Sequence, residues 1–237
     1  MLLAADIGNT QTCMGVYEGK TLVSQCRFVT NKQSDASDIV SRIEENIDKN
    51  LRIDRFVLSC VVPALQPLYI RAVEELFGIS AMICNAKTAT EAGLFCADYP
   101  NPDEIGADRV ADAVAARELF GSPVIVVDLG TATNIEVIDK SGLFVGGVIA
   151  SGMEVSAAYL FKAASQLSDV ELTAPERAIG RSSKEALQSG IVFGEADKID
   201  GLVHRILKEL SYDAKDVCVV ATGGFAKRIA PLSQTIT

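Results

Sequence analysis

The stretch Asp6-Ile7-Gly8-Asn9-Thr10 returns 122 residues later as Asp128-Leu129-Gly130-Thr131-Ala132-Thr133, in a chain of 237 residues. Each copy follows a short apolar strand and precedes a predicted β-hairpin. Because a pattern that recurs at a fixed spacing indicates repeated architecture, we interpret the chain as an internal duplication. The predicted fold class is α/β, with two duplicated lobes, each a mixed sheet flanked by helices, and a nucleotide cleft between them. We place the lobes at residues 1–120 and 121–237.

Hydrophobic periodicity predicts the elements around these two turns. Short apolar runs predict strands at 2–5, 12–17, 21–28, 56–62, 81–84, 124–127, 134–138, 143–149 and 217–221. Helical spacing predicts helices at 65–77, 106–119, 153–165 and 183–210, and the glycines of the last one allow a break. A further helix carries Ile39, Ile43 and Ile47, and Ser34 or Ser37 is its expected N-cap. The pattern weakens between residues 88 and 105.

Composition excludes several classes of protein. Apolar residues make up 49% of the chain, which is too many for a disordered protein. The net charge is −9 and no basic run is present, so nucleic acid is not an expected partner. No apolar stretch is long enough to span a membrane, and the first five residues are too short for a signal peptide.

The cysteines and the histidine favour a cytoplasmic protein without a zinc site. The six cysteines form no CxxC pair, several lie in apolar runs, and the chain has one histidine. We therefore expect buried free thiols in a reducing compartment. His204 is expected at the surface. The apolar stripe Met153, Tyr159 and Leu160 is expected in the core or in a subunit interface.

The first turn has the composition of a phosphate-binding loop. Gly8 allows backbone to approach a bound group closely, and Asn9 and Thr10 add hydrogen-bond donors. Asp6, at the end of a strand, can hold a hydrated Mg²⁺ ion. A metal and donors in this arrangement suit the β- and γ-phosphates of a nucleotide. Taken alone, a turn of this kind is more typical of a plain Asx turn between two strands.

The second turn strengthens the nucleotide interpretation. Asp128, Gly130, Thr131 and Thr133 repeat the arrangement, and Gly223-Gly224 after the last strand would let backbone approach a base or ribose. Two symmetrically placed turns would both touch a nucleotide bound between the lobes. The chain has no Walker A sequence and no G-x-G-x-x-G after a strand, so a P-loop or Rossmann site is not supported.

A fourth element, Gly106-Ala107-Asp108-Arg109, lies at a predicted helix N-terminus. Asp108 could accept the proton of an attacking hydroxyl, and Arg109 can hold a carboxylate in a bidentate manner. The alternative is an acidic helix cap at Asp108 with Arg109 in a surface ion pair.

Together these motifs resemble the type III pantothenate kinases of the acetate and sugar kinase/heat-shock/actin superfamily. The resemblance covers essentially the whole chain in order, and implies ribonuclease H-like, actin-like ATPase lobes. It rests on the two Asp-x-Gly turns and on these further motifs: Ser59-Cys60-Val61-Val62-Pro63, Tyr99-Pro100-Asn101-Pro102, Gly106-Ala107-Asp108-Arg109, Gly146-Gly147-Val148-Ile149, Ser151-Gly152 and Thr222-Gly223-Gly224.

The resemblance implies a role for each matching position. The reaction would be phosphorylation of pantothenate by ATP to 4′-phosphopantothenate, the first step of coenzyme A biosynthesis, in a homodimer. Asp108 would be the catalytic base. Asp6 would hold Mg²⁺, and Asp128 a monovalent cation, K⁺ or NH₄⁺. ATP would be bound by Asp6, Ile7, Gly8, Asn9, Thr10, Gln11, Thr12, Cys13 and Thr131, with Gly223 and Gly224 at the adenosine. Pantothenate would be bound by Tyr99, Gly106, Ala107, Asp108, Arg109 and Ser183.

The chain departs from the family pattern in two places. Ser183 stands where a threonine that touches the substrate is expected, which keeps the hydroxyl. Family members also continue with another helical stretch beyond the position of Thr237. Two rival interpretations follow from the same fold: an accessory or regulatory relative that binds nucleotide without transferring phosphate, and an actin-like scaffold that polymerises.

Overall fold

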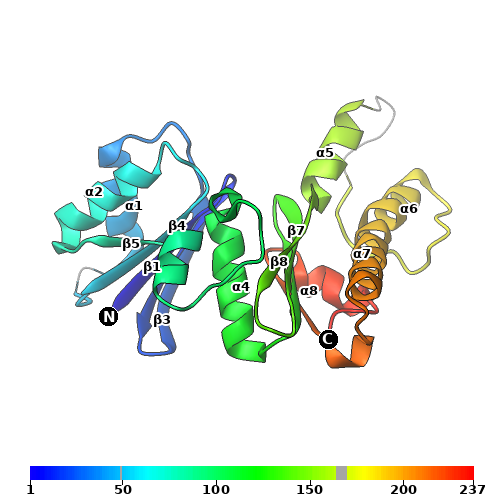
Figure 1. Ribbon diagram of the computed structural model, residues 1–237. Coiled ribbons are helices and arrows are strands. Elements are labelled where there is room, and N and C mark those ends of the chain that lie inside the picture. Colours follow the sequence, from blue (N-terminus) through cyan, green and yellow to red (C-terminus); the bar gives the residue numbers. More distant parts are fainter. Residues whose placement is uncertain (49, 164–169) are drawn as a thin grey trace. The chain divides into compact units, whose positions relative to one another are not determined.

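The computed structural model describes residues 1–48, 50–163 and 170–237, which form two compact units (Figure 1). Unit 1 consists of Met1–Phe95 and Asn101–Ala111, and unit 2 of Cys96–Pro100 and Asp112–Thr237. Helix α4 (Ala107–Phe120) begins in unit 1 and ends in unit 2. The contacts therefore divide the chain within α4, whereas the lobe boundary at residue 120 stays a prediction from sequence.

Unit 1 contains a five-stranded mixed sheet in the order β3-β2-β1-β4-β5. Strand β1 is antiparallel to β2 and parallel to β4, so the first three strands form a meander and the fourth returns beside β1. The strands are β1 (Leu2–Ile7), β2 (Gln11–Glu18), β3 (Thr21–Val29), β4 (Arg55–Cys60) and β5 (Ala81–Ile83). The helical segments are α1 (Ala36–Asn46), α2 (Gln66–Phe77), α3 (Ala86–Glu91), η1 (Pro102–Glu104) and the start of α4.

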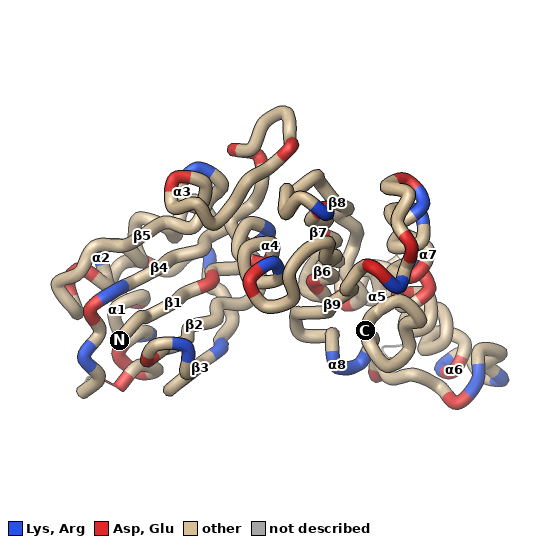
Figure 2. Tube along the Cα trace, turned by 60° about the horizontal axis from the view of Figure 1, so that its bottom comes forward, with Lys and Arg blue, Asp and Glu red and all other residues tan. Residues whose placement is uncertain are grey.

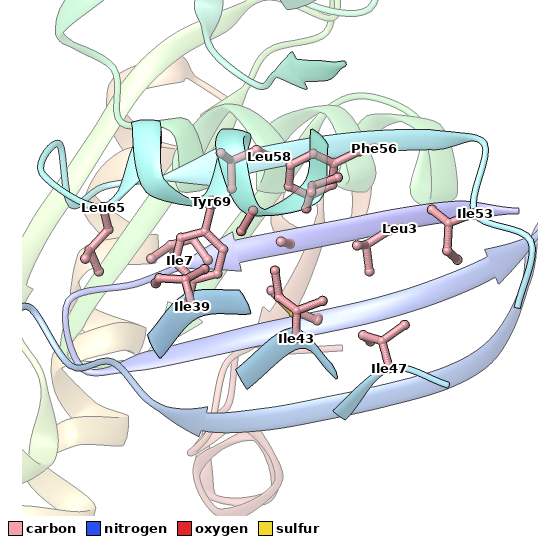
Figure 3. Close-up of a cluster of buried hydrophobic side chains, with 14 of the residues drawn as sticks. Leu3, Ile7, Ile39, Ile43, Ile47, Ile53, Phe56, Leu58, Leu65 and Tyr69 are labelled. Carbon is pink, nitrogen blue, oxygen red and sulfur yellow. The ribbon is translucent and has the colours of Figure 1, made fainter. Parts of the chain in front are cut away.

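Alternation along β1 decides which side chains enter the core of unit 1. Leu3 and Ile7 are fully buried and lie in one cluster with Ile43 of α1 and Tyr69 of α2 (Figure 3). Successive side chains of a strand point to opposite faces, so Asp6 points to the other face. The core of unit 1 thereby fixes the face on which the first turn presents its carboxylate.

Helix ends in unit 1 are specified by local hydrogen bonds. The N-cap of α1 is Asp35, whose carboxylate accepts from the backbone N–H of Asp38 at 2.9 Å. The prediction of Ser34 or Ser37 was wrong, because the side chain of Asp38 also accepts from the Asp35 N–H and completes a capping box. At the end of α2, Gly78 takes a left-handed conformation with φ of 68°, which glycine adopts readily.

Unit 2 repeats the strand order of unit 1 in its sheet β8-β7-β6-β9, which confirms the duplicated α/β fold. Strand β6 is antiparallel to β7 and parallel to β9, as β1 is to β2 and β4. The strands are β6 (Val124–Leu129), β7 (Ala132–Ile138), β8 (Phe144–Ser151) and β9 (Cys218–Thr222). The helical segments are α5 (Met153–Ala163), α6 (Ser183–Gln188), η2 (Ser189–Phe193), α7 (Gly194–Leu210), η3 (Ala214–Asp216), α8 (Ala226–Ile229) and η4 (Ala230–Leu232).

The long helix predicted at 183–210 is divided by a π-helical turn. This turn, η2, lies between α6 and α7, and Gly190 falls inside it. Gly201 does not interrupt α7, whose buried side chains, among them Ile199 and Val203, pack on the sheet in the second core cluster. Single π-helical turns occur often at functional sites. The helix predicted at 153–165 is described as far as Ala163, and its last two residues lie outside the described residues.

The side chains singled out from the sequence have mixed outcomes. All six cysteines are free, as predicted, but they are less buried than expected: Cys26 and Cys60 are partly buried against the core of unit 1, and Cys96 is exposed. His204 is exposed, as predicted. Met153 is buried, but Tyr159 of the same stripe has 75% of its surface exposed. No helix within the described residues combines the length and the apolar character needed to cross a bilayer.

Candidate active site

The first turn leaves the sheet of unit 1 at the end of β1. The Gly8 N–H donates to the Gln11 carbonyl at 3.0 Å and closes the loop. Asn9, Thr10 and Gln11 are exposed, whereas Ile7 and Thr12 are fully buried. Ile7 and Thr12, which belong to the predicted ATP-binding residues, therefore support the loop from the core.

The loop is also held by the segment that follows β3. The Thr30 N–H donates to the Thr10 carbonyl at 2.9 Å, and the hydroxyls of Thr12 and Thr30 lie 2.9 Å apart in a buried hydrogen bond. Lys32 Nζ donates to Asn9 Oδ1 at 2.8 Å, which brings an ammonium group to the exposed side of the turn. A lysine here was not predicted, because it lies 23 residues away along the chain.

Asp6 is accessible to solvent yet flanked by protein groups. Ser59 Oγ, on the parallel strand β4, donates to Asp6 Oδ1 at 2.8 Å. Partial loss of hydration raises the pKa of Asp6, the Ser59 hydrogen bond acts to lower it, the negative charge of Asp108 raises it, and the positive charge of Arg27 lowers it. Desolvation is the largest of these effects, so Asp6 ionises less readily than an ordinary aspartate.

Asp108 stands in the first turn of α4, in the part of this helix that belongs to unit 1. Its Oδ1 atom accepts from the Arg109 N–H at 2.8 Å, and the positive end of the helix dipole favours a carboxylate there. A Cβ atom on Gly106 would lie 2.5 Å from Asp108 Oδ1, so this glycine makes room for the carboxylate. The structure therefore brings Asp6, Gly106 and Asp108 together. Arg109 is buried, which does not fit a surface ion pair.

Unit 2 builds its own turn at the end of β6. The Gly130 N–H donates to the Ala132 carbonyl at 3.0 Å, and the Gly152 N–H donates to the Thr131 carbonyl at 3.1 Å. Gly223, after β9, has φ of 90°, and a Cβ atom there would collide with Asp128 Oδ1 and with the Leu129 carbonyl. Asp128, Thr131 and Gly223 are thus gathered in one place.

The predicted pantothenate residues are distributed over both units. Tyr99 belongs to unit 2, where its ring packs edge-on against Phe144 with centroids 6.0 Å apart. Ser183 is the first residue of α6 and is exposed. The contacts of the described residues do not bring Ser183 to Tyr99 or to the second turn. The grouping of Tyr99 with Gly106–Arg109 in one binding segment stays a prediction.

A buried polar chain beside the second turn was missed from sequence. Thr133 Oγ1 donates to Glu195 Oε1 at 2.5 Å, and Lys198 Nζ donates to Glu195 Oε2 at 2.7 Å and to the Ser151 carbonyl at 3.0 Å. Glu195 is the second residue after the π-helical turn and is buried. The available signal was a Glu and a Lys three residues apart on one helix, which by itself is typical of an exposed face.

Unit 1 offers a carboxylate but no preformed cluster of metal ligands among its described residues. Among the described residues, no group of three His, Cys, Asp or Glu side chains is placed to hold a metal ion. Mg²⁺ in kinases is commonly held through one or two carboxylates together with the substrate phosphates. Asp6, accessible at the end of β1 and next to a phosphate-type turn, fits that mode of binding.

Two kinds of sequence comparison point to the same protein family. The family model described as type III pantothenate kinase matches residues 2–205. A type III pantothenate kinase of Frankia casuarinae is 39% identical over 236 residues, which cover 100% of this chain and 92% of the relative. That of Halalkalibacterium halodurans is 37% identical over 240 residues, with the same coverage of 100% and 92%.

A solved structure shares the fold at much lower sequence identity. The ROK hexokinase of Thermus thermophilus superposes with a TM-score of 0.51 and 15% identity, over 99% of this chain and 91% of the hexokinase. At this identity the likeness concerns the fold alone.

Proposed function

This chain belongs to the type III pantothenate kinase family, and we propose that it transfers the γ-phosphoryl group of ATP to pantothenate, giving 4′-phosphopantothenate. The observation that carries the proposal is the meeting of two carboxylates in unit 1. Asp6 is the last residue but one of strand β1, beside a phosphate-type turn, and Asp108 lies in the first turn of helix α4, close enough for its charge to raise the pKa of Asp6. A kinase needs a carboxylate for the metal and another for the acceptor hydroxyl.

Asp108 is the proposed general base. Its carboxylate takes the proton of the pantothenate hydroxyl as the new oxygen–phosphorus bond forms and the bond from the γ-phosphorus to the leaving ADP breaks. The Arg109 N–H and the helix dipole hold the carboxylate in place before the substrate arrives. Catalysis then depends mainly on positioning and on neutralisation of charge.

Asp6 is the proposed Mg²⁺ ligand, and the exposed part of the first turn, Asn9–Gln11, the proposed phosphate contact. The metal ion, when bound with ATP, neutralises charge on the phosphate oxygens. The second turn, with Thr131 and Gly223, is the proposed second phosphate and adenosine site. Asp128 in that turn is the proposed ligand of the monovalent cation.

Tyr99, Arg109 and Ser183 are the proposed pantothenate contacts, and the protein is proposed to act as a homodimer. Exposed apolar side chains on α5 support a subunit interface in unit 2. Val155 has 45%, Tyr159 75% and Leu160 38% of its surface exposed on this helix. Light scattering of the purified protein tests the dimer.

The reaction is tested directly with purified protein, ATP, Mg²⁺ and pantothenate, with and without K⁺, and with mass-spectrometric detection of 4′-phosphopantothenate. Product that increases with K⁺ supports both the reaction and the monovalent cation. ATP binding without product in either condition would instead favour the non-catalytic accessory relative.

A further inference from the structure

Four polar residues form one row across the sheet of unit 1, at the end where β1 enters the first turn. Arg27 on β3 is the register partner of Cys13 on β2, Cys13 is the partner of Asp6 on β1, and Asp6 is the partner of Ser59 on β4. Directly opposed residues on neighbouring strands share a face. Adjacent strands lie about 4.8 Å apart, so the Arg27 backbone is about 10 Å from that of Asp6, within reach of an arginine side chain.

The guanidinium group of Arg27 is held at one edge and open at the other. Its Nε–H donates to Cys13 Sγ at 3.1 Å, and Cys13 stands between Arg27 and Asp6 in the row. The positive charge is near enough to favour the ionised form of Asp6. Arg27 is exposed, and among the described residues no acceptor is bonded to its two Nη amino groups and no carboxylate forms an ion pair with it.

The first turn gathers negative charge, and the guanidinium of Arg27 provides a positive charge beside it. Asp6 and Asp108 already place two carboxylates there, in a chain with a net charge of −9. A phosphoryl group in transfer brings further negative charge, spread over its equatorial oxygens. Basic residues are scattered along the trace in Figure 2, and the strand register places one of them, Arg27, in the same row as Asp6.

We propose that Arg27 is a catalytic residue, whose two Nη amino groups donate hydrogen bonds to oxygens of the phosphoryl group during its transfer. This inference rests on the proposed function. The planar guanidinium matches two phosphoryl oxygens in a bidentate manner, which a lysine ammonium cannot do. Cys13 is a positioning residue, which occupies the Nε edge and leaves the Nη edge for the substrate.

The experiment compares the wild-type protein with Arg27→Gln, Arg27→Lys and Cys13→Ala. Arg55→Gln is the matched control. Arg55 is on β4 and points to the same face as Ser59, but it pairs with Leu2, about 13 Å from the row. The values of kcat and KM are measured for ATP and pantothenate, and the affinities for ATP and for adenosine by calorimetry. Circular dichroism confirms that each variant is folded.

We expect Arg27→Gln to lower kcat by about 10³-fold, the lower end of the effect of arginine in phosphoryl transfer. Arg27→Lys should recover part of this loss, because it keeps the positive charge without the bidentate geometry. Cys13→Ala should lower kcat by only about 3- to 10-fold, the equivalent of one hydrogen bond. Adenosine affinity should be unchanged in all variants, and Arg55→Gln should behave like wild type.

The proposal is overturned if Arg27→Gln keeps its kcat at alkaline pH and merely shifts the acid limb of the pH profile. Arg27 would then only tune the ionisation of Asp6. A loss equal to that of Arg55→Gln would overturn it as well. If the wild-type protein forms no 4′-phosphopantothenate, the proposed function fails instead. In that case a weaker affinity of Arg27→Gln for ATP but not for adenosine still supports the phosphate contact, and equal affinities reject it.

Discussion

The two Asp-x-Gly turns sit on sheets with the same strand order, but different groups stand beside their carboxylates. In unit 1 the parallel strand β4 presents Ser59, whose hydroxyl donates to Asp6 at 2.8 Å. In unit 2 the parallel strand β9 presents Thr222 at the matching position, and the next residue, Gly223, brings backbone against Asp128. The residue directly after this matching position is Cys60 in unit 1 and Gly223 in unit 2.

From this difference we infer that the two duplicated turns have different roles. The sheet decides where a carboxylate stands, since Asp6 and Asp128 occupy the same position in the strand order. The neighbouring segment decides what the carboxylate faces. Asp6 faces a second carboxylate and a guanidinium, which suits chemistry on a phosphate, whereas Asp128 faces a glycine backbone, which suits close binding of a ligand.

The largest effect is expected at Asp108, the second carboxylate beside the first turn. Asp108→Asn should lower kcat by about 10²- to 10⁴-fold, the usual contribution of a general base. Asp128→Asn, the change in the second turn, should mainly weaken stimulation by K⁺ and raise KM for ATP. Steady-state kinetics with varied ATP and K⁺ measure both variants. A near-normal kcat in Asp108→Asn would show that this residue is not the general base. It would also contradict the proposed difference in role between the two turns.

Much of this comparison was accessible from sequence, because strands and repeats leave local patterns. The apolar runs before Asp6 and Asp128 predicted both turns and the duplicated fold. Helix α3 was missed because it is short and is specified by a capping box, in which Asn85 accepts from the Thr88 N–H at 2.9 Å, rather than by periodicity.

The groups around the carboxylates were harder to predict, for a physical reason. Ser59 and Arg27 reach Asp6 through strand register, which joins positions 53 and 21 residues away and leaves no local signal. Asp108 was predicted because Gly106, which makes room for its carboxylate, lies only two residues before it in the same motif. Local contacts are therefore visible in sequence, whereas contacts set by register appear only when the sheet is known.

The second largest effect is expected at the glycine that distinguishes the second turn. Gly223→Ala should lower the free energy of unfolding by about 2–4 kcal/mol, from collision with Asp128 together with left-handed strain. Cys60→Ala, at the matching place in unit 1, should change it by about 1 kcal/mol or less. Urea unfolding measures both variants. Gly201→Ala, where a Cβ atom meets no other atom within 4 Å, is the glycine control. Equal effects of Gly223→Ala and Gly201→Ala would contradict the close approach.

A third prediction contrasts two carboxylates whose pKa values shift in opposite directions. Burial acts to raise the pKa of Asp200, but hydrogen bonds from Ser233, Gln234 and Thr235 outweigh it and hold the pKa below its ordinary value. A lowered pKa adds stability above the ordinary aspartate pKa, and this stability is lost as the pH falls through the folded-state value. Asp6, with a raised pKa, gives the opposite sign, because its protonation favours the folded state.

Asp200→Asn should therefore lower the free energy of unfolding by about 1–3 kcal/mol at neutral pH. The difference from wild type should shrink as the solution is acidified below the ordinary aspartate range. Urea unfolding across this pH range measures it, with Asp197→Asn on the exposed side of α7 as the matched control. A difference that stays constant down to low pH would show that the charge of Asp200 is not what holds the segment Ser233–Thr235.

The smallest effect is expected at the hydroxyl beside Asp6. Ser59→Ala removes a hydrogen bond that lowers the pKa of Asp6, so this pKa should rise further. Because Asp6 must be ionised to hold the metal, the acid limb of the pH profile of kcat/KM should move to higher pH. Activity at alkaline pH should change by less than about 10-fold. Thr222→Ala, the matching change beside Asp128, should leave that limb in place. A shift of the same size in both variants would mean that the limb does not report Asp6, and that the two turns are less specialised than their neighbours indicate.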